Sequence, residues 1–191
     1  MPLMPFSLQR HVLWPLLVVC GFLGSVLLAW RLLAAVDFLY PVWYEVIEID
    51  ATIAEYGPRN RYKHHFEATD KAERLRLFAA ISDAIFDKGR GLETLRYHLP
   101  EGTPIDTLLR KPEIVHLRSV ADLAALLERS GWIALAIAFA LGIVTLYQGA
   151  RLPSLGRSLA GFSGLLMLGT VGVLILGPEE VFYGLHSRFF P

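Results

Sequence analysis

The chain has 191 residues, enough for one ordinary domain, and 54% of them are hydrophobic, more than a soluble domain of that size usually contains. Its 18 basic and 18 acidic residues balance to zero net charge without a clustered basic run, which argues against a nucleic-acid partner. The single cysteine, Cys20, rules out an intrachain disulfide and a thiolate metal cluster. We therefore predict an integral membrane protein that is mainly α-helical.

Three apolar blocks without a charged side chain carry this prediction; they are residues 12–30, 131–150 and 158–178. A helix rises about 1.5 Å per residue and the hydrocarbon core of a bilayer is about 30 Å thick, so each block is long enough to span it. With flanking residues, we place three transmembrane helices at residues 12–36, 130–150 and 158–178.

Small residues recur at every fourth position in the first two blocks, and such ridges let membrane helices approach closely. The positions are Gly21, Ser25 and Ala29 in the first block and Ala134, Ala138 and Gly142 in the second. We expect the spans to pack as a compact bundle, although small residues are common in any bilayer helix.

The basic residues of the short polar segments set the expected orientation. Residues 151–157 form a short loop with Arg151, Arg157 and no acid, and residues 1–11 contain Arg10 and no acid. Both segments are therefore expected in the cytoplasm.

Between the first two spans, residues 37–129 hold 16 of the 18 acidic and 13 of the 18 basic residues, which is the composition of a solvated domain. The orientation predicts that this domain and residues 179–191 are extracytoplasmic. An alternative for residues 1–35 is a cleaved signal peptide, because they combine a basic start, an apolar core and small residues near the end. Arg31 lies where that cleavage region should be neutral, so we prefer an uncleaved anchor.

The outer domain is predicted to be mostly helical with a small β-hairpin. Mixed apolar spacing predicts a helix at residues 42–55, ended by Gly57. The clearest helix follows Asp70, which forms a capping-box pair with Glu73, and this helix ends at Gly89. A hairpin is predicted around "PEGTP", and the helix after it runs into the second span.

Aromatic residues gather where the outer membrane surface is expected, and their apolar rings with polar tips suit that interface. They are Trp43, Tyr44, Trp132, Phe182, Tyr183, Phe189 and Phe190. We interpret them as membrane anchors. The alternative is that they form an apolar groove that binds an acyl chain.

His116 is the first candidate for chemistry, because it lies early in a charged helix that continues into a span. Glu113 precedes it by three residues and Ser119 follows it by three, so both share roughly its side of the helix. Either group could fix the tautomer of the imidazole and leave the other nitrogen free as a base. A half-buried histidine on an amphipathic helix is also ordinary, so the spacing alone leaves a structural role open.

His186 favours a catalytic role for His116, since it follows the third span and is expected on the same side of the membrane as His116. Two histidines at the water–lipid boundary suit acid/base work on a lipid-borne ester or amine. His98 could join them around a metal ion, but no metal-binding spacing such as HExxH or CxxC supports a metal or another cofactor. His64 and His65 are adjacent in sequence, which makes a poor chelate, and they are expected at the surface.

The segments "EIVHLRSVADLAAL" and "FYGLHSRFFP" together resemble the Lit family of bacterial membrane proteins, the lipoprotein intramolecular transacylases and their relatives. The family pattern is a first span, an extracytoplasmic domain that ends in an "HLxDV" helix before the second span, a short cytoplasmic loop, and a histidine near an "FFP"-like element after the third span. The pattern continues into a fourth span, for which these 191 residues have no counterpart, so a fragment or a shortened relative is expected.

The resemblance implies transfer of an acyl chain from the diacylglyceryl group on a lipoprotein's N-terminal cysteine to the α-amino group of that cysteine. His116 and His186 match the two motif histidines and are the implied catalytic pair. Ser119 stands where the family has an aspartate, which leaves Glu113 as the expected orienting group. Arg188 or backbone amides near the hairpin are the candidates for stabilising the oxyanion. The implied location is the bacterial cytoplasmic (inner) membrane, with membrane lipid or a lipoprotein as substrate and no cofactor.

Three functions remain as hypotheses at this point. The first is an extracytoplasmic-facing membrane acyltransferase that acts on lipoprotein or another lipid-linked amine. The second is a non-enzymatic integral membrane protein whose outer domain binds a lipid or a partner, with histidines that are structural. The third is a metal-dependent membrane hydrolase.

Overall fold

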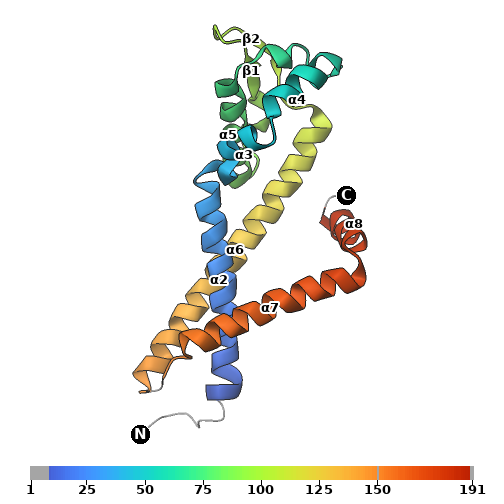
Figure 1. The fold of residues 1–191 in the computed structure, drawn as a ribbon. Helices are drawn as coiled ribbons and strands as arrows, with labels where there is room; N and C mark the ends of the chain where they lie inside the picture. Colours follow the sequence, from blue (N-terminus) through green and yellow to red (C-terminus); the bar gives the residue numbers. More distant parts are fainter. Residues whose placement is uncertain (1–8, 150, 190–191) are drawn as a thin grey trace. The chain divides into compact units, whose positions relative to one another are not determined.

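The computed structural model describes residues 9–149 and 151–189, and most of them are helical (Figure 1). The chain forms two compact units. An apolar unit comprises Met1–Trp30 and Leu126–Pro191, and a polar unit comprises Arg31–Ala125. The polar unit contains most of the charged stretch that separates the first two apolar blocks.

Among the described residues, three helices are long and apolar enough to cross a membrane: α2 (Trp14–Ala34), α6 (Lys111–Tyr147) and α7 (Leu155–Leu176). The predicted number of membrane-length apolar helices is therefore confirmed for this part of the chain. A π-helical turn (Gln9–Leu13) precedes α2, and α8 (Pro178–Phe189) follows α7. Because α6 runs without a break for 37 residues, the predicted second span is the C-terminal part of a longer helix that begins in the polar unit.

Within the apolar unit, α2 and α6 approach each other closely at two glycines. A Cβ atom on Gly24 would lie 2.9 Å from Leu135 Cδ1, and one on Gly131 would lie 2.7 Å from Leu27 Cβ. Ala134, a member of the predicted small-residue ridge in α6, is buried about one turn after Gly131. Small residues therefore do bring these two helices together, as is usual for membrane helices.

The buried face of α2 differs from the predicted ridge. Cys20, Gly24 and Leu27 are buried, whereas Ser25 and Ala29 are exposed. The contact runs one residue away from that ridge, because a pattern of small residues does not reveal which side of a helix meets a partner.

α7 packs on α2 near its own N-terminal half. A Cβ atom on Gly161 would lie 2.7 Å from Val18 Cγ1, and the rings of Phe22 and Phe162 meet edge-on with centroids 5.5 Å apart. No residue of α7 is buried. Most of its remaining apolar side chains are exposed, which is compatible with a helix surrounded by lipid.

The polar unit begins with a broken helical segment. α3 (Tyr40–Val46) and α4 (Ile49–Tyr56) are separated by Glu48, whose φ of 51° is left-handed. The Tyr44 hydroxyl donates a hydrogen bond to Asp50 Oδ1 across this break. The prediction of one continuous helix here is wrong, because contacts across the break offset the cost of a left-handed non-glycine residue.

α5 (Lys71–Phe86) is the predicted central helix of this unit. Its N-cap is Asp70, whose Oδ1 accepts the Glu73 backbone N–H at 2.8 Å. The helix ends before the left-handed Gly89 (φ 74°), whose N–H donates to Ala84 O at 2.7 Å. That hydrogen bond satisfies a terminal carbonyl, as in the Schellman type of helix end.

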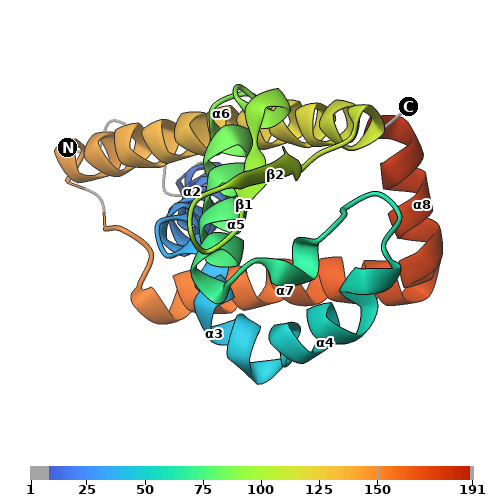
Figure 2. The same ribbon diagram turned by 90° about the horizontal axis from the view of Figure 1, so that it is seen from above.

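The predicted hairpin is present as β1 (Arg96–His98) and β2 (Pro104–Thr107), which pair antiparallel and lie against α5 (Figure 2). Tyr97 is fully buried, at 0% exposure, and forms a core with Leu77 and Leu108. This core holds the end of β1 next to the start of α5.

Short 3-10 turns connect these elements; they are Asp37–Leu39, Gly57–Arg59, Phe66–Ala68 and Leu92–Thr94. The first part of α6 completes the unit, and an ion pair between Arg118 and Glu93 ties α6 to the turn after α5. The N-terminal part of α6, up to Ala125, therefore belongs to the polar unit, and the rest of the helix belongs to the apolar unit.

Candidate functional site

His116 lies in the second turn of α6, within the polar unit, and its side chain is exposed. Val115, its neighbour in sequence, is also exposed, at 61%. The imidazole is therefore open to solvent rather than half-buried.

The two groups expected to orient His116 have other partners. Glu113 Oε2 accepts the Arg110 backbone N–H at 2.9 Å and lies 3.2 Å from Lys63 Nζ, while its Oε1 accepts Arg110 Nε at 3.0 Å. Ser119 Oγ donates to Val115 O at 3.3 Å, one turn back in α6. Glu113 thus caps the helix and pairs with two cations, and Ser119 hydrogen-bonds to its own helix.

His186 lies on α8, in the apolar unit, and is half-buried. Its ring stacks on Phe182 with centroids 5.5 Å apart and an interplanar angle of 23°. Arg188, the candidate for steadying an oxyanion, is exposed on the same helix. Phe190 and Pro191, which complete the second motif, lie outside the described residues.

The two predicted catalytic histidines belong to different units of the structure: His116 is in the polar unit and His186 is in the apolar unit. Each is therefore positioned by its own unit. Glu113 and Ser119 share the polar unit with His116, and Arg188 shares the apolar unit with His186.

A cluster that sequence reasoning missed lies where β1 meets α5; we call Glu73, Arg76 and His98 the Glu73 cluster. Glu73 Oε1 is 2.9 Å from His98 Nδ1 and accepts the His98 backbone N–H at 2.9 Å. Arg76 donates to both carboxylate oxygens, with Nε 2.6 Å from Oε2 and Nη2 2.6 Å from Oε1. Arg76 Nη2 also donates to Arg96 O at 2.9 Å.

The electrostatics of this cluster favour an ionised carboxylate. The hydrogen bonds from Arg76, and to a lesser degree those from His98, outweigh partial burial and lower the pKa of Glu73 to about 2. The same ion pair raises the pKa of Arg76 above its ordinary value. A charged, bidentate pair of this kind is stronger and better oriented than a neutral hydrogen bond.

The Glu73 cluster lines a shallow hollow of about 360 Å³ together with Asp70 and Ala72 at the start of α5 and with Leu99, Pro100 and Gly102 of the hairpin. With its Nδ1 beside a carboxylate, the His98 ring is held in a defined orientation, as in acid/base sites that pair histidine with an acid. The spacing of Asp70 and Glu73 had predicted a capping box. The structure confirms one half of this box, the hydrogen bond from the Glu73 backbone N–H to Asp70 Oδ1. The Glu73 side chain instead contacts His98 of the hairpin. The cluster could therefore be recognised only once β1 was seen to pack against α5.

Arg74 forms a second polar network, which is structural. It is 7% exposed and donates to Thr69 Oγ1 at 2.9 Å, to Tyr44 Oη at 3.0 Å and to the carbonyls of Glu67 and Thr69. It also pairs with Asp50. These contacts join α3, α4 and α5, so we call them the Arg74 network.

The aromatic residues divide into two groups. Trp43, Trp132, Phe182 and Tyr183 are exposed, as anchors at a membrane surface would be. Tyr44 is 1% exposed, so its assignment as an anchor is wrong: its hydroxyl is needed by the Arg74 network, and burial, followed by the hydrogen bond to Asp50, raises its pKa. Phe190 lies outside the described residues.

Metal binding was the minor alternative for the histidines. Over residues 9–149 and 151–189, no three histidine, cysteine, aspartate or glutamate side chains come together as a metal site would require. His64 and His65 are both exposed, as predicted.

Comparison of the chain with protein-family models, curated proteins and solved structures gives no match. The features of the chain that bear on function are His116 and His186, which lie on helical chain adjoining membrane-length apolar segments, and the Glu73 cluster of the polar unit.

Proposed function

We propose that the protein is a membrane transacylase that moves an acyl chain from the diacylglyceryl group of a lipoprotein to the α-amino group of its N-terminal cysteine. His116 and His186 form the acid/base pair. The observation that carries the proposal is that each histidine lies on helical chain directly adjoining a membrane-length apolar segment, His116 on α6 before it and His186 on α8 after α7.

Connectivity supports a common side for these histidines. α6 ends at Tyr147 and α7 begins at Leu155, so the two apolar helices are joined by a short connection. If both cross the membrane, they cross in opposite directions. The chain before the apolar part of α6 and the chain after α7 then emerge on the same face. The basic loop at 151–157 favours the extracytoplasmic side for that face.

The chemistry needs a base and an acid in turn. The α-ammonium group has an ordinary pKa near 8 and must lose a proton before its nitrogen attacks the glyceryl ester carbonyl. One histidine accepts that proton; the ester C–O bond then breaks as the new amide C–N bond forms, and the glyceryl oxygen leaves with a proton returned by the pair. Nucleophile and ester belong to one molecule, so holding them in attack geometry supplies much of the acceleration.

The other predicted residues take supporting roles in this proposal. Arg188 lies two residues after His186 and is exposed, so its guanidinium can face the carbonyl oxygen as negative charge develops there. Glu113 is engaged with Arg110 and Lys63 and holds the start of α6, which fixes the position of the His116 backbone. We assign Glu113 a positioning role.

Mass spectrometry of lipoprotein N-termini in bacteria tests the proposal. Cells that express the wild-type chain should gain lipoproteins with an N-acylated cysteine and one free glyceryl hydroxyl, whereas His116→Ala and His186→Ala cells should not. His64→Ala, at an exposed histidine of the same polar unit, is the matched control and should behave as wild type. An unchanged acylation pattern with the wild-type chain would overturn the proposal.

A specific observation favours a second function, binding of a lipid surface by the polar unit without catalysis. Val42, Trp43, Val46 and Ile47 on and after α3 are 52–64% exposed and form a short apolar stretch close to the end of α2. Exposed apolar residues next to a span suit a membrane surface. A photo-crosslinking residue in place of Trp43 should capture phospholipid; capture of a protein instead would indicate a protein partner.

A further inference from the structure

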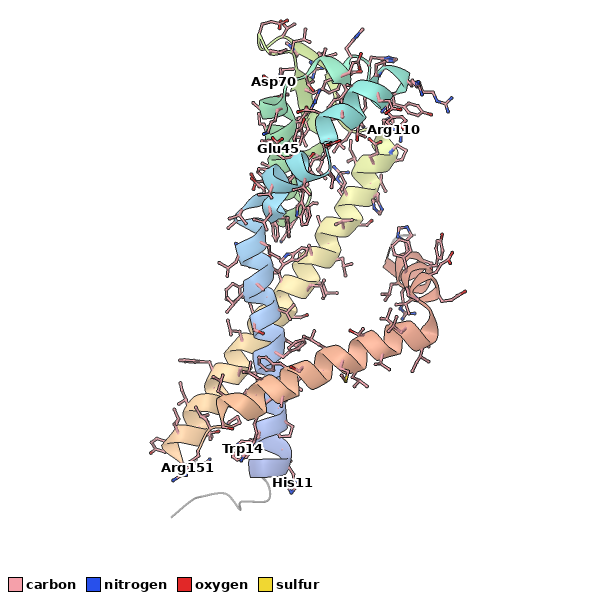
Figure 3. All side chains as sticks on the ribbon, viewed as in Figure 1. His11, Trp14, Glu45, Asp70, Arg110 and Arg151 are labelled. Carbon is pink, nitrogen blue, oxygen red and sulfur yellow. The ribbon has the colours of Figure 1, made fainter. Side chains whose placement is uncertain are left out.

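A groove opens on the apolar unit at the end where α6 connects to α7. It has a volume of about 600 Å³ and is lined by the first turns of α2, by Pro153 and by the N-terminal half of α7. Figure 3 shows Trp14 and Arg151 at this same end of the unit. The groove lies wholly within the apolar unit, and neither histidine is among the residues that line it.

The groove has apolar walls along most of its length. Val18 and Val19 form the α2 side, and Gly161 and Leu165 form the α7 side. The close approach of Gly161 to Val18 joins the two helices, since a Cβ atom on Gly161 would lie 2.7 Å from Val18 Cγ1. An apolar groove between two helices of membrane length has the chemistry of an acyl-chain site.

One end of the groove is cationic. The Arg157 guanidinium lies over the Trp14 ring with its carbon 5.0 Å from the centroid. No acidic residue is among those described that line the groove, so the positive charge is not neutralised there by a carboxylate of the wall. An arginine held on an aromatic face keeps donors available for a phosphate oxygen.

Trp14 adds an unsatisfied donor to this region. Its indole Nε1 is buried and has no acceptor among the described residues. Buried donors in proteins nearly always have a partner, so protein atoms alone do not complete the polar end of the groove.

We propose that this groove binds one anionic phospholipid, with an acyl chain between α2 and α7 and its phosphate at Arg157. Charge complementarity selects the occupant: the walls accept a hydrocarbon chain, and the end beside Trp14 accepts an anion. A free phosphate ion would leave the apolar walls uncovered, and a zwitterionic lipid would bring a cation to an already cationic end. The site goes beyond the proposed acyl transfer and does not depend on it.

Native mass spectrometry of the full chain tests this site. The protein is released from bilayers that contain equal amounts of phosphatidylglycerol and phosphatidylcholine with the same acyl chains, and retained lipids are counted. The wild type should retain one phosphatidylglycerol in preference to phosphatidylcholine. Arg157→Gln should lower that preference about fivefold, the effect of one cation near an anionic headgroup. Arg151→Gln, in the same basic loop but not lining the groove, should leave it unchanged.

A second pair of variants tests the apolar part. Val19 lines the groove and is 38% exposed, whereas Val26 lies farther along α2, outside the groove, and is 50% exposed. Val19→Trp should fill the groove and lower the amount of retained lipid severalfold, and Val26→Trp should not. Equal retention of the two lipids by the wild type, equal effects of the two arginine variants, or full retention by Val19→Trp would each overturn the proposal.

Discussion

Arg74 shows how a single side chain can hold the polar unit together: it is buried, donates hydrogen bonds to Tyr44 and to residues 67–69, and pairs with Asp50. Arg74→Met should remove these contacts, leave the Tyr44 hydroxyl and two carbonyls short of donors, and destabilise the unit by about 3 kcal/mol. Hydrogen exchange of the α3–α5 amides in the full chain measures this loss. Arg90→Met, at an exposed arginine that pairs with Asp87 three residues away, is the control and should leave exchange unchanged.

Glu73 makes the stability of the polar unit depend on pH. Its pKa in the folded chain is about 2, below its ordinary 4.5. Because the folded value is depressed, the carboxylate contributes stability that is complete above about pH 4.5 and is lost as the pH falls toward 2. Thermal unfolding between pH 6 and pH 2.5 should therefore show a smaller loss for Glu73→Gln than for the wild type.

A matched variant isolates this effect at Glu73. Glu101 is exposed in the hairpin loop, so Glu101→Gln should retain the wild-type slope of stability against pH. If Glu73→Gln and the wild type lose stability in parallel over the acid range, the Glu73 cluster does not make the contribution described.

Among the elements, the contact between α2 and α6 depends on glycine at a particular position. A Cβ on Gly131 would meet Leu27 at 2.7 Å, whereas a Cβ on Gly142, in the same helix, would meet nothing within 4 Å. Gly131→Ala should therefore lower stability by about 1–3 kcal/mol through overpacking. Gly142→Ala should be neutral or slightly stabilising, because alanine has the better helix propensity. Unfolding midpoints in detergent measure both; equal midpoints would contradict this packing.

The elements also show what the sequence can predict. The apolar helices, α5 with its Asp70 cap and the hairpin follow from local length, capping and turn chemistry, which a single segment contains. The break at Glu48 does not, because it is stabilised by Tyr44 and Asp50 on either side of it. The buried face of α2 could not be predicted either, since it depends on where α6 lies.

The candidate site follows the same division. His116 and His186 could be selected from residue type and chain order, because both adjoin apolar segments. The Glu73 cluster joins residues 25 positions apart through the docking of β1 on α5, and neither segment alone signals it. Likewise, the spacing of residues along α6 could not predict the ion pair between Glu113 and Lys63, because Lys63 lies 50 positions earlier in the chain.

At the scale of the whole molecule, the proposal requires the polar unit and α8 to face the same side of the membrane. Cys20 is the single cysteine, so in a Cys20→Ala chain one new cysteine can report its own location. A membrane-impermeant maleimide applied to intact cells should label Glu101→Cys and Glu180→Cys. It should label Gly156→Cys, at the start of α7, only after permeabilisation. Labelling of Gly156→Cys in intact cells, or different results for the other two, would contradict the topology.

The most direct test of acyl transfer uses purified full chain and a synthetic diacylglyceryl lipopeptide. Intramolecular transfer leaves the mass of the lipopeptide unchanged but converts its free amine into an amide. Tandem mass spectrometry with an amine-reactive label should therefore find a product of unchanged mass whose cysteine nitrogen is blocked. His116→Ala and His186→Ala should slow its formation by about 100-fold or more. A lipopeptide that keeps its free amine with the wild-type protein would contradict the central claim.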